Sequence, residues 1–190
     1  MTRTLAIGIA IKLRENGHED MADAVLISFD CYLRASEIVT LRGADVHIRG
    51  RLDPPTAPAA TLRLANTKTG ANQAVSVRRP LALAAVRRRL KHAPGAVLFS
   101  FSYKQYLAAW HEALSDLGIG QLGLLLHGLR HGGATDDHVN NGVPLQDVVL
   151  RGRWTNARTA ARYIQVGQAL SASLALPRPA QIWLTARRQQ

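Results

Sequence analysis

The chain has 190 residues, 47% of them hydrophobic and 19% charged, which predicts one domain with a substantial core and argues against disorder. Its net charge is +11, so we expect a polyanionic partner. No apolar run reaches the roughly 18–20 residues of a membrane-spanning helix and no signal peptide opens the chain, which favours nucleic acid over lipid and an intracellular location.

The first part of the chain alternates between helical and extended patterns. Apolar residues at intervals of three or four predict a first helix from about His18 to Leu33, in which Cys31 is a buried, inert thiol. Arg34 follows directly, and an arginine at the end of an apolar helix is by itself usually a solvated cap. Next we expect a short helix at 35–41, a turn at 42–45, a strand at 46–51 and a proline-rich loop at 53–58.

A β-hairpin is predicted next, with Lys68 near its tip. Thr61–Leu64 and Ala74–Val77 alternate between apolar and polar residues, and the segment between them is rich in turn formers. A lysine at a hairpin tip most simply provides solubility. Lysine is scarce in this chain, however, and its presence here favours a role that needs a proton donor with a shiftable pKa.

Two longer helices are predicted in the middle of the chain. One spans Pro80–His92 and the other Tyr103–Leu117. The first ends in basic residues that include Arg87 and Arg88, which form either a solvated face or a face that follows phosphates. The resulting fold class is α+β, mainly α-helical, with a small antiparallel sheet or hairpin on one edge.

The stretch 126–165 carries residues that suit phosphoryl transfer. It holds His127 and Arg130 one turn apart, then an apolar helical pattern, then Trp154, with Tyr163 nine residues further on. Arginine binds phosphate bidentately and stays charged, histidine moves protons near neutral pH, and tyrosine can form a covalent intermediate. The order of these residues therefore suggests a tyrosine nucleophile.

A zinc site is the alternative interpretation of the histidines. His127 and His131 have the i, i+4 spacing of a zinc pair on a helix, and His138 could supply a third ligand. The zinc-hydrolase pattern needs a glutamate after the first histidine, and Gly128 stands there. We therefore interpret His131 as a hydrogen-bonding or structural residue, and we expect no metal and no other cofactor.

Together these motifs resemble the catalytic domain of the tyrosine recombinases, or phage-type integrases. Leu33–Leu41 matches the family's Leu-Arg-x-x-Glu-Ile/Leu-x-x-Leu segment. Lys68 matches its lysine in a β-hairpin turn, and His127–His131 matches its His-x-Leu-Arg-His motif. Trp154 and Tyr163 match a His or Trp that stands nine residues before the nucleophilic tyrosine.

The resemblance runs from about residue 18 to Tyr163 and implies cleavage and rejoining of double-stranded DNA through a 3′-phosphotyrosyl intermediate. Tyr163 would be the nucleophile, and Arg34 and Arg130 would neutralise charge that develops on the scissile phosphate. Because the phosphotyrosyl bond conserves the energy of the phosphodiester, resealing would need neither ATP nor metal.

The resemblance also implies roles for three further residues. His127 would act as the base, Lys68 would protonate the departing 5′ oxygen, and Trp154 would donate its indole N–H to a phosphate oxygen. Arginines that we expect to contact DNA are Arg87, Arg88, Arg151, Arg153 and Arg158.

The sequence departs from the family pattern at three points, and the third concerns the domain organisation. Trp154 replaces the commoner histidine of Leu-Gly-His, and Tyr32-Leu33 stands where Gly-Leu is frequent. The N-terminal helical DNA-clamping domain of full recombinases is not visible before the first predicted helix. We expect a catalytic domain at 1–165 and a tail at 166–190 that either packs on a neighbouring protomer of a homotetramer on DNA or folds back on its own domain. The chain would be a naturally minimal protein, a fragment, or one that depends on an accessory DNA-binding domain or protein.

Two other functions are compatible with the same residues. One is a non-catalytic, domesticated DNA-binding module, and the other is a relaxase similar to type IB topoisomerases. Covalent trapping on nicked DNA separates a catalyst from a binder, and relaxation by a monomer without recombinant product indicates the relaxase.

Overall fold

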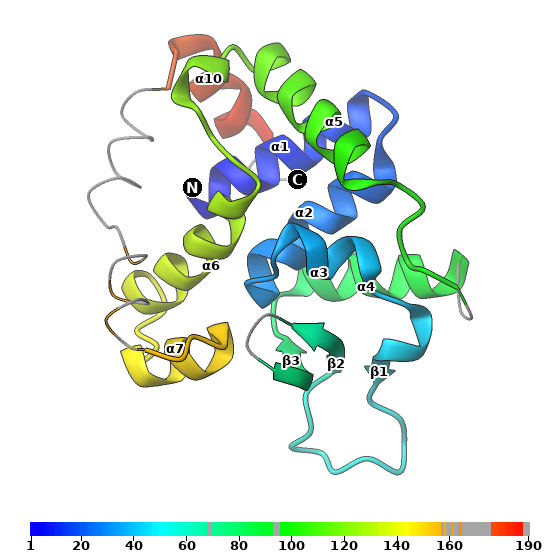
Figure 1. Cartoon of the computed structure of the whole chain (residues 1–190). Coiled ribbons are helices and arrows are strands. Elements are labelled where there is room, and N and C mark those ends of the chain that lie inside the picture. Colours follow the sequence, from blue (N-terminus) through cyan, green and yellow to red (C-terminus); the bar gives the residue numbers. More distant parts are fainter. Residues whose placement is uncertain are drawn as a thin grey trace.

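The structure is a computed structural model that describes residues 1–67, 70–92, 96–156, 158, 161, 164 and 176–187. Helices dominate this part of the chain, and a small three-stranded antiparallel sheet lies at one edge (Figure 1). The helices are α1 (Arg3–Glu15), α2 (Glu19–Cys31), α3 (Ala35–Thr40), α4 (Pro80–His92), α5 (Tyr103–Asp116), α6 (His127–Val139), α7 (Leu145–Gly152) and α10 (Arg178–Arg187). The strands are β1 (Val46–Ile48), β2 (Ala60–Thr67) and β3 (Gly70–Val77), and the short 3₁₀ helices are η1 (Gly43–Asp45) and η2 (Gly120–Leu122). The predicted fold class is confirmed.

Helix α1 was missed by the prediction, which placed the first helix at about residue 18. Thr2 caps its start by accepting a hydrogen bond from the backbone N–H of Leu5 at 3.3 Å. The chain turns just beyond its end at Gly17, which has a φ of +81°. Leu5, Ile9 and Leu13 recur every four residues, are buried, and lie on the face that packs against α2. The apolar residues of this segment follow a helical period, and their burial against α2 stabilises the helix.

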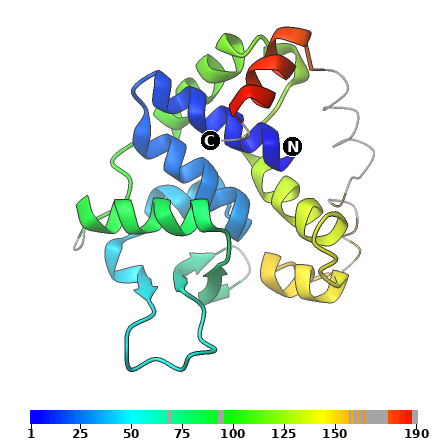
Figure 2. The same cartoon turned by 180° about the vertical axis from the view of Figure 1, so that it is seen from behind.

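Helix α2 lies at the centre of the core. Helices α1, α4 and α6 pack around it (Figures 1 and 2), and its residues from Met21 to Cys31 are all buried. A helix that is covered on every side accommodates polar residues only when they are paired. Asp23 is paired with three arginines, Arg14 at 2.6 Å, Arg88 at 2.8 Å and Arg89 at 2.9 Å.

The three strands pair in the order β1-β2-β3, and β2 and β3 form the predicted hairpin. Its last described pair is Thr67 with Gly70, so the connection consists of residues 68 and 69, which lie outside the described residues. Leu62, Val75 and Val77 are buried on one face of the sheet, as period-two alternation requires.

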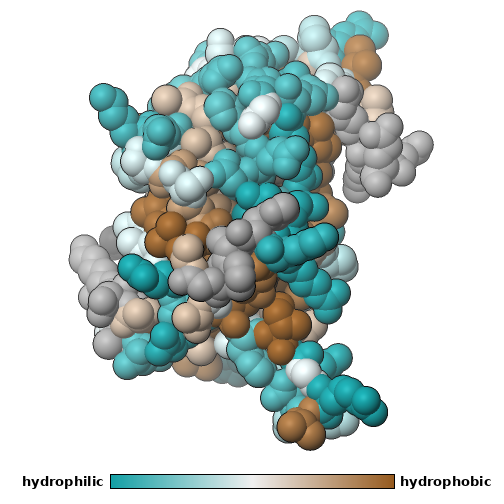
Figure 3. Space-filling view, turned by 90° about the vertical axis from the view of Figure 1, so that its right-hand side faces the viewer, coloured by the Kyte–Doolittle hydropathy of each residue, from teal (hydrophilic) through white to brown (hydrophobic). Residues whose placement is uncertain are grey.

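The loop between β1 and β2 (residues 49–59) projects from the sheet as the lowest lobe of the molecule in Figure 3. Its own hydrogen bonds hold it, since Arg49 Nη1 donates to the carbonyls of Pro55 and Ala57, each at 2.8 Å. The loop is therefore an ordered projection that adds nothing to the core.

The last described helix, α10, packs on α1 of the same chain. Ala180 and Leu184 are buried there, and a β-carbon at Gly8 would lie 2.1 Å from Leu184 Cδ2. Lys12 Nζ lies 5.2 Å from the centre of the Trp183 ring. The helix begins at Arg178, and Pro179 stands in its first turn, where a proline loses no intrahelical hydrogen bond.

Candidate active site

Arg34 stands at the start of α3, and Glu37, one helical turn further on, binds it. The Glu37 carboxylate accepts from the Arg34 backbone N–H at 2.8 Å and from Arg34 Nη1 at 2.7 Å. The Arg34 side chain is 22% exposed and that of Glu37 is 3% exposed. Arg34 is therefore an oriented guanidinium at the surface of the site, which differs from the solvated cap that its position alone suggests.

Glu37 also binds Arg153, which directly follows α7. Arg153 Nη2 lies 2.8 Å from Glu37 Oε2, and both side chains are buried. Burial lowers the pKa of Arg153, while the Glu37 carboxylate opposes this shift. The sequence assigned no role to Glu37, although an acid one helical turn after an arginine is a signal for such a pair.

Arg130, on α6, is 1% exposed and makes its contacts inside the protein. Its Nη1 donates to the carbonyl of Tyr32, and its Nη2 donates to the carbonyl of Gly152. The guanidinium carbon lies 4.5 Å from the centre of the Trp154 ring, within the range of a cation–π contact. One buried arginine thus joins the ends of α2 and α7.

Trp154 covers the end of α7 so closely that only glycine fits beneath it. A β-carbon at Gly152 would lie 1.8 Å from Trp154 Cζ3. The indole also lies beside Tyr32, with 6.1 Å between ring centres. Trp154 therefore packs on Arg130, Tyr32 and Gly152 together.

His127 is the first residue of α6, and its side chain is exposed at the surface. Partial loss of hydration lowers its pKa, the positive charges of Arg130 and Arg34 lower it further, and Glu37 opposes them. These effects keep the imidazole neutral at pH 7. Arg34 and Arg130 are linked through Glu37, Arg153 and the Tyr32 carbonyl, and His127 lies one turn before Arg130 on α6.

His131 lies one turn further along α6. Its ring meets that of His127 edge-on, with 4.4 Å between ring centres. Burial lowers its pKa to about 4, assisted by His127, Arg130 and the terminal amine. His138, the third residue of the zinc alternative, is at the other end of α6, where its Nδ1 is 2.9 Å from the carbonyl oxygen of Val143.

A second cluster of charged residues adjoins the candidate site and was not predicted from the sequence. Arg79 bridges Asp30 at 3.1 Å, Asp136 at 2.8 Å and Asp137 at 2.6 Å. Three carboxylates outweigh the effect of burial and raise the pKa of Arg79. Because these residues come from α2, α6 and the segment before α4, the cluster ties three distant segments together.

Two of the five predicted DNA contacts require correction. Arg151 is buried against Asp30, with its Nη2 2.7 Å from the Asp30 carbonyl oxygen, and Arg153 is buried against Glu37. A buried carboxylate neutralises each of these two guanidiniums, Asp30 that of Arg151 and Glu37 that of Arg153, so the two arginines hold α7 in place. Arg88 is partly exposed and paired with Asp23, while Arg87 and Arg158 are exposed.

The other two predicted site residues, Lys68 and Tyr163, lie outside the described residues. Four of the six, Arg34, His127, Arg130 and Trp154, therefore have described positions, and these four gather where α3, α6 and α7 meet.

Two open clefts border this junction. One, of about 720 Å³, runs between α3 and β2 and is lined by Arg34, Arg42 and Arg63 among others. The other, of about 350 Å³, lies between β3 and α7 beside Arg153 and Trp154. The first cleft places three arginines in a concave surface of the kind that a DNA backbone can enter.

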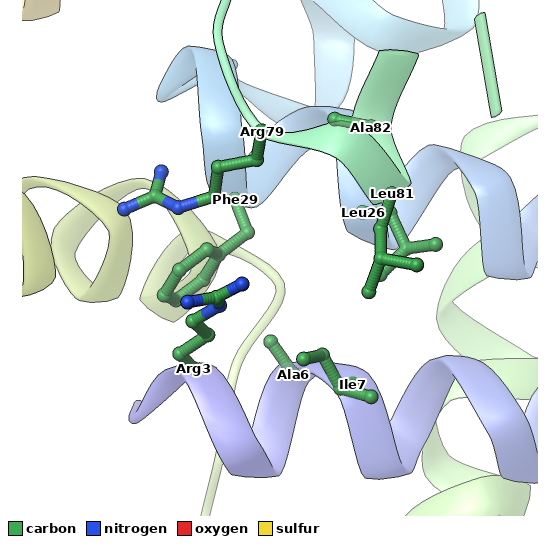
Figure 4. A pocket seen from close by; sticks show the side chains of 8 residues that line it. All are labelled: Arg3, Ala6, Ile7, Leu26, Phe29, Arg79, Leu81 and Ala82. Carbon is green, nitrogen blue, oxygen red and sulfur yellow. The ribbon is translucent and has the colours of Figure 1, made fainter. Parts of the chain in front are cut away.

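A third hollow, between α1, α2 and the start of α4, is far smaller. Figure 4 shows its mainly apolar lining, with Phe29 between the side chains of Arg3 and Arg79. Its volume of about 20 Å³ has room for little more than one water molecule. It is not a substrate site.

Comparison with known proteins identifies the family. The model described as the phage integrase family matches residues 11–169. The chain belongs to the phage integrase family. No curated protein matches this integrase-family chain. In its described part, no helix is long and apolar enough to cross a membrane.

Among solved structures, the integrase-family chain is similar to a crystal structure of XerA recombinase. The TM-score is 0.68 at 16% sequence identity, and the match covers 98% of this chain and 65% of that one. At this identity the likeness shows a shared fold. The chain spans 65% of the length of the XerA recombinase chain.

Proposed function

We propose that this chain is a recombinase catalytic domain that cleaves and rejoins double-stranded DNA through a 3′-phosphotyrosyl intermediate. The observation that carries the proposal is the chain of contacts that joins Arg34 to Arg130 through Glu37, Arg153 and the Tyr32 carbonyl. His127 lies one helical turn before Arg130, and Trp154 packs on Arg130. Family membership supports the same reaction class. Two guanidiniums beside a neutral imidazole suit a phosphodiester, which gains negative charge as it becomes pentavalent.

In the proposed cleavage step, the Tyr163 hydroxyl attacks the phosphorus and passes its proton to His127. The bond from phosphorus to the 5′ oxygen breaks, and Lys68 gives that oxygen a proton. Arg34 and Arg130 neutralise the non-bridging oxygens. In rejoining, a 5′ hydroxyl attacks the phosphotyrosine and releases Tyr163, so no nucleotide is consumed.

The electrostatics of His127 support its role as the base. A base has to be unprotonated before it can accept a proton, and the lowered pKa keeps this imidazole in that state at pH 7. The indole N–H of Trp154 would donate a hydrogen bond to the phosphate without taking part in proton transfer.

A non-catalytic DNA-binding module is the second candidate, and one observation favours it. Arg130 is 1% exposed and donates to two backbone carbonyls, so the site has to open over Arg130 before a phosphate reaches it. A module that only binds DNA does not need a phosphate to reach Arg130, so it needs no such opening.

The proposed partners are double-stranded DNA, further copies of the chain in a tetramer, and an accessory DNA-binding domain or protein. Contact with phosphates would come from Arg87 and Arg158, and from Arg42 and Arg63 beside Arg34. We also propose that the tail at 166–190 is exchanged between protomers. In the single chain α10 packs on α1, so exchange requires α10 to be released.

A suicide DNA substrate tests the function. A nick placed so that the short leaving strand diffuses away traps the covalent complex, which migrates as a protein–DNA adduct on a denaturing gel. We expect an adduct with the unaltered chain and none with Tyr163→Phe, at equal DNA binding. Salt-sensitive binding without any adduct would establish the binding module instead.

A further inference from the structure

Tyr32 has a backbone conformation that is rare for its residue type. It ends α2 with φ +51° and ψ +44°, in the left-handed region. Residues other than glycine avoid this region because Cβ approaches the following carbonyl oxygen. Within the described residues, Asn72 and Arg153 are the other non-glycine residues with positive φ.

The left-handed turn points the Tyr32 carbonyl at the site. In a continuing helix this oxygen would face the backbone N–H four residues on. Here it accepts from Arg130 Nη1, and from Arg153 Nη2 at 3.2 Å. One carbonyl thus receives two guanidiniums from distant segments, one on α6 and one directly after α7. Arg153 also contacts Glu37, which holds Arg34.

The Tyr32 side chain is anchored, and the anchor maintains the backbone turn. The residue is 0% exposed, and its hydroxyl donates to Asp137 Oδ2. Asp137 is itself held by Arg79 at 2.6 Å. The Tyr32 ring contacts both Trp154, with 6.1 Å between ring centres, and the Arg151 guanidinium, whose carbon is 5.2 Å from the Tyr32 ring centre.

We propose that Tyr32 is a positioning residue of the active site, whose anchored left-handed turn fixes the orientation of the Arg130 guanidinium beneath the surface that the scissile phosphate would approach. The inference rests on the proposed function. Tyr32 touches no substrate atom and acts through Arg130, Arg153 and Trp154. Strained backbone that is over-determined by its surroundings is a common means of fixing a catalytic group.

The test compares three full-length variants for cleavage of the suicide substrate. Tyr32→Val removes the anchor and disfavours positive φ, so we expect cleavage slower on the order of 10²-fold at unchanged DNA affinity. Tyr32→Gly adopts positive φ readily and should cleave faster than Tyr32→Val, although it removes more of the side chain. Tyr32→Phe loses only the hydroxyl contact and should fall between the unaltered chain and Tyr32→Val.

Tyr106→Val is the matched control. Tyr106 is a buried tyrosine on α5 that packs on Phe101, with 5.0 Å between ring centres. The control removes a comparable buried ring away from the site, so cleavage below its melting temperature should be unchanged.

A substrate whose scissile group is uncharged tests whether Tyr32 acts through Arg130. A methylphosphonate at the scissile position leaves less charge to neutralise, so the deficits of Arg130→Ala and Tyr32→Val should both shrink on it. A general loss of folding would slow cleavage of both substrates equally. This comparison also tests the proposal if Tyr32→Gly fails to fold, because it needs only Tyr32→Val and Arg130→Ala.

Several results would overturn the inference. The first is cleavage by Tyr32→Val at the rate of the unaltered chain. The second is a rate that falls with the amount of side chain removed, so that a folded Tyr32→Gly is the slowest variant. The third is an equal deficit of Tyr32→Val on the ordinary and the methylphosphonate substrates. A further readout needs no DNA: exchange of the Arg130 guanidinium protons, followed by NMR, should be slow in the unaltered chain and fast in Tyr32→Val. If the unaltered chain forms no adduct, the proposed function fails, while this exchange still decides whether Tyr32 fixes Arg130.

Discussion

Glu37 holds Arg34 through both its backbone and its side chain. One carboxylate oxygen accepts from the backbone N–H at 2.8 Å and the other accepts from Nη1 at 2.7 Å. The same carboxylate meets Arg153 at 2.8 Å. A single buried acid therefore orients a proposed catalytic arginine at the start of α3 and joins it to the end of α7.

Replacing this acid should destabilise the protein and the site together. Glu37→Gln keeps the size of the side chain but leaves Arg34 and Arg153 without their shared negative charge, and we expect a loss of about 3 kcal/mol in the free energy of unfolding. Urea denaturation measures it. Glu112→Gln is the control, because Glu112 is 54% exposed and its loss should change stability by no more than about 0.5 kcal/mol. Equal effects of the two changes would contradict the role assigned to Glu37.

Gly152→Ala should displace Trp154. The new methyl group would lie 1.8 Å from Trp154 Cζ3, and overpacking of this kind costs about 1–3 kcal/mol. Thermal unfolding measures the cost, and the indole N–H signal of Trp154 in an NMR spectrum reports the displacement. Gly120→Ala is the matched control, since no atom lies within 4 Å of its new β-carbon. An unmoved Trp154 signal in Gly152→Ala would show that the ring does not cover this glycine in solution.

Protonation of His131 should destabilise the fold in mild acid. Its pKa is about 4 in the folded chain against an ordinary 6.5, so below pH 6.5 the unfolded chain takes up a proton that the folded chain does not. Stability should therefore be constant above pH 6.5 and fall between pH 6.5 and 4, by about 2 kcal/mol after allowance for the part of the ring that remains in solvent. His131→Asn should flatten this dependence, as measured by denaturation at several pH values. An equally steep curve in that variant would assign the effect to other groups.

Lys68 is expected to act as a proton donor. This role predicts that Lys68→Ala loses cleavage of ordinary DNA and that a better leaving group restores it. Lys68→Ala should slow cleavage of ordinary DNA by about 10²–10⁴-fold, because the departing alkoxide is very basic. With sulfur in place of the bridging 5′ oxygen, the leaving thiolate, whose acid has a pKa of about 8.5, hardly needs a proton. Lys68→Ala should then match the unaltered chain, while Arg34→Ala and Arg130→Ala stay slow on both substrates. Failure of sulfur to rescue Lys68→Ala would make the lysine a phosphate contact or a bystander.

Removal of residues 166–190 tests the proposed exchange of the tail. The shortened chain should bind a single DNA site and fail to assemble on paired sites, as measured by native gel and light scattering. Leu125→Ala serves as a surface control, because Leu125 is 61% exposed and lies outside the tail. Unchanged assembly by the shortened chain would rule out the exchange.

Much of the fold follows from local periodicity. The helix at Pro80–His92 and the hairpin were predicted correctly because an apolar period of 3.6 or 2 depends on backbone geometry within a few residues. The family was indicated by motifs, in order along the chain, that hold Arg34, Lys68, His127, Arg130, Trp154 and Tyr163, and the match over residues 11–169 confirms it. Helix α1 has the same kind of period and was missed.

The partners of the charged side chains could not be predicted from the sequence. Arg151 and Arg153 look like surface charges in the sequence, and only the packing of α7 against the end of α2 buries them beside Asp30 and Glu37. Arg130 was predicted to face a phosphate, and the fold turns two of its nitrogens toward the carbonyls of Tyr32 and Gly152. Local sequence determines which way a helix faces, but the partner of a buried charge depends on which distant segments meet, and that is decided by tertiary packing alone.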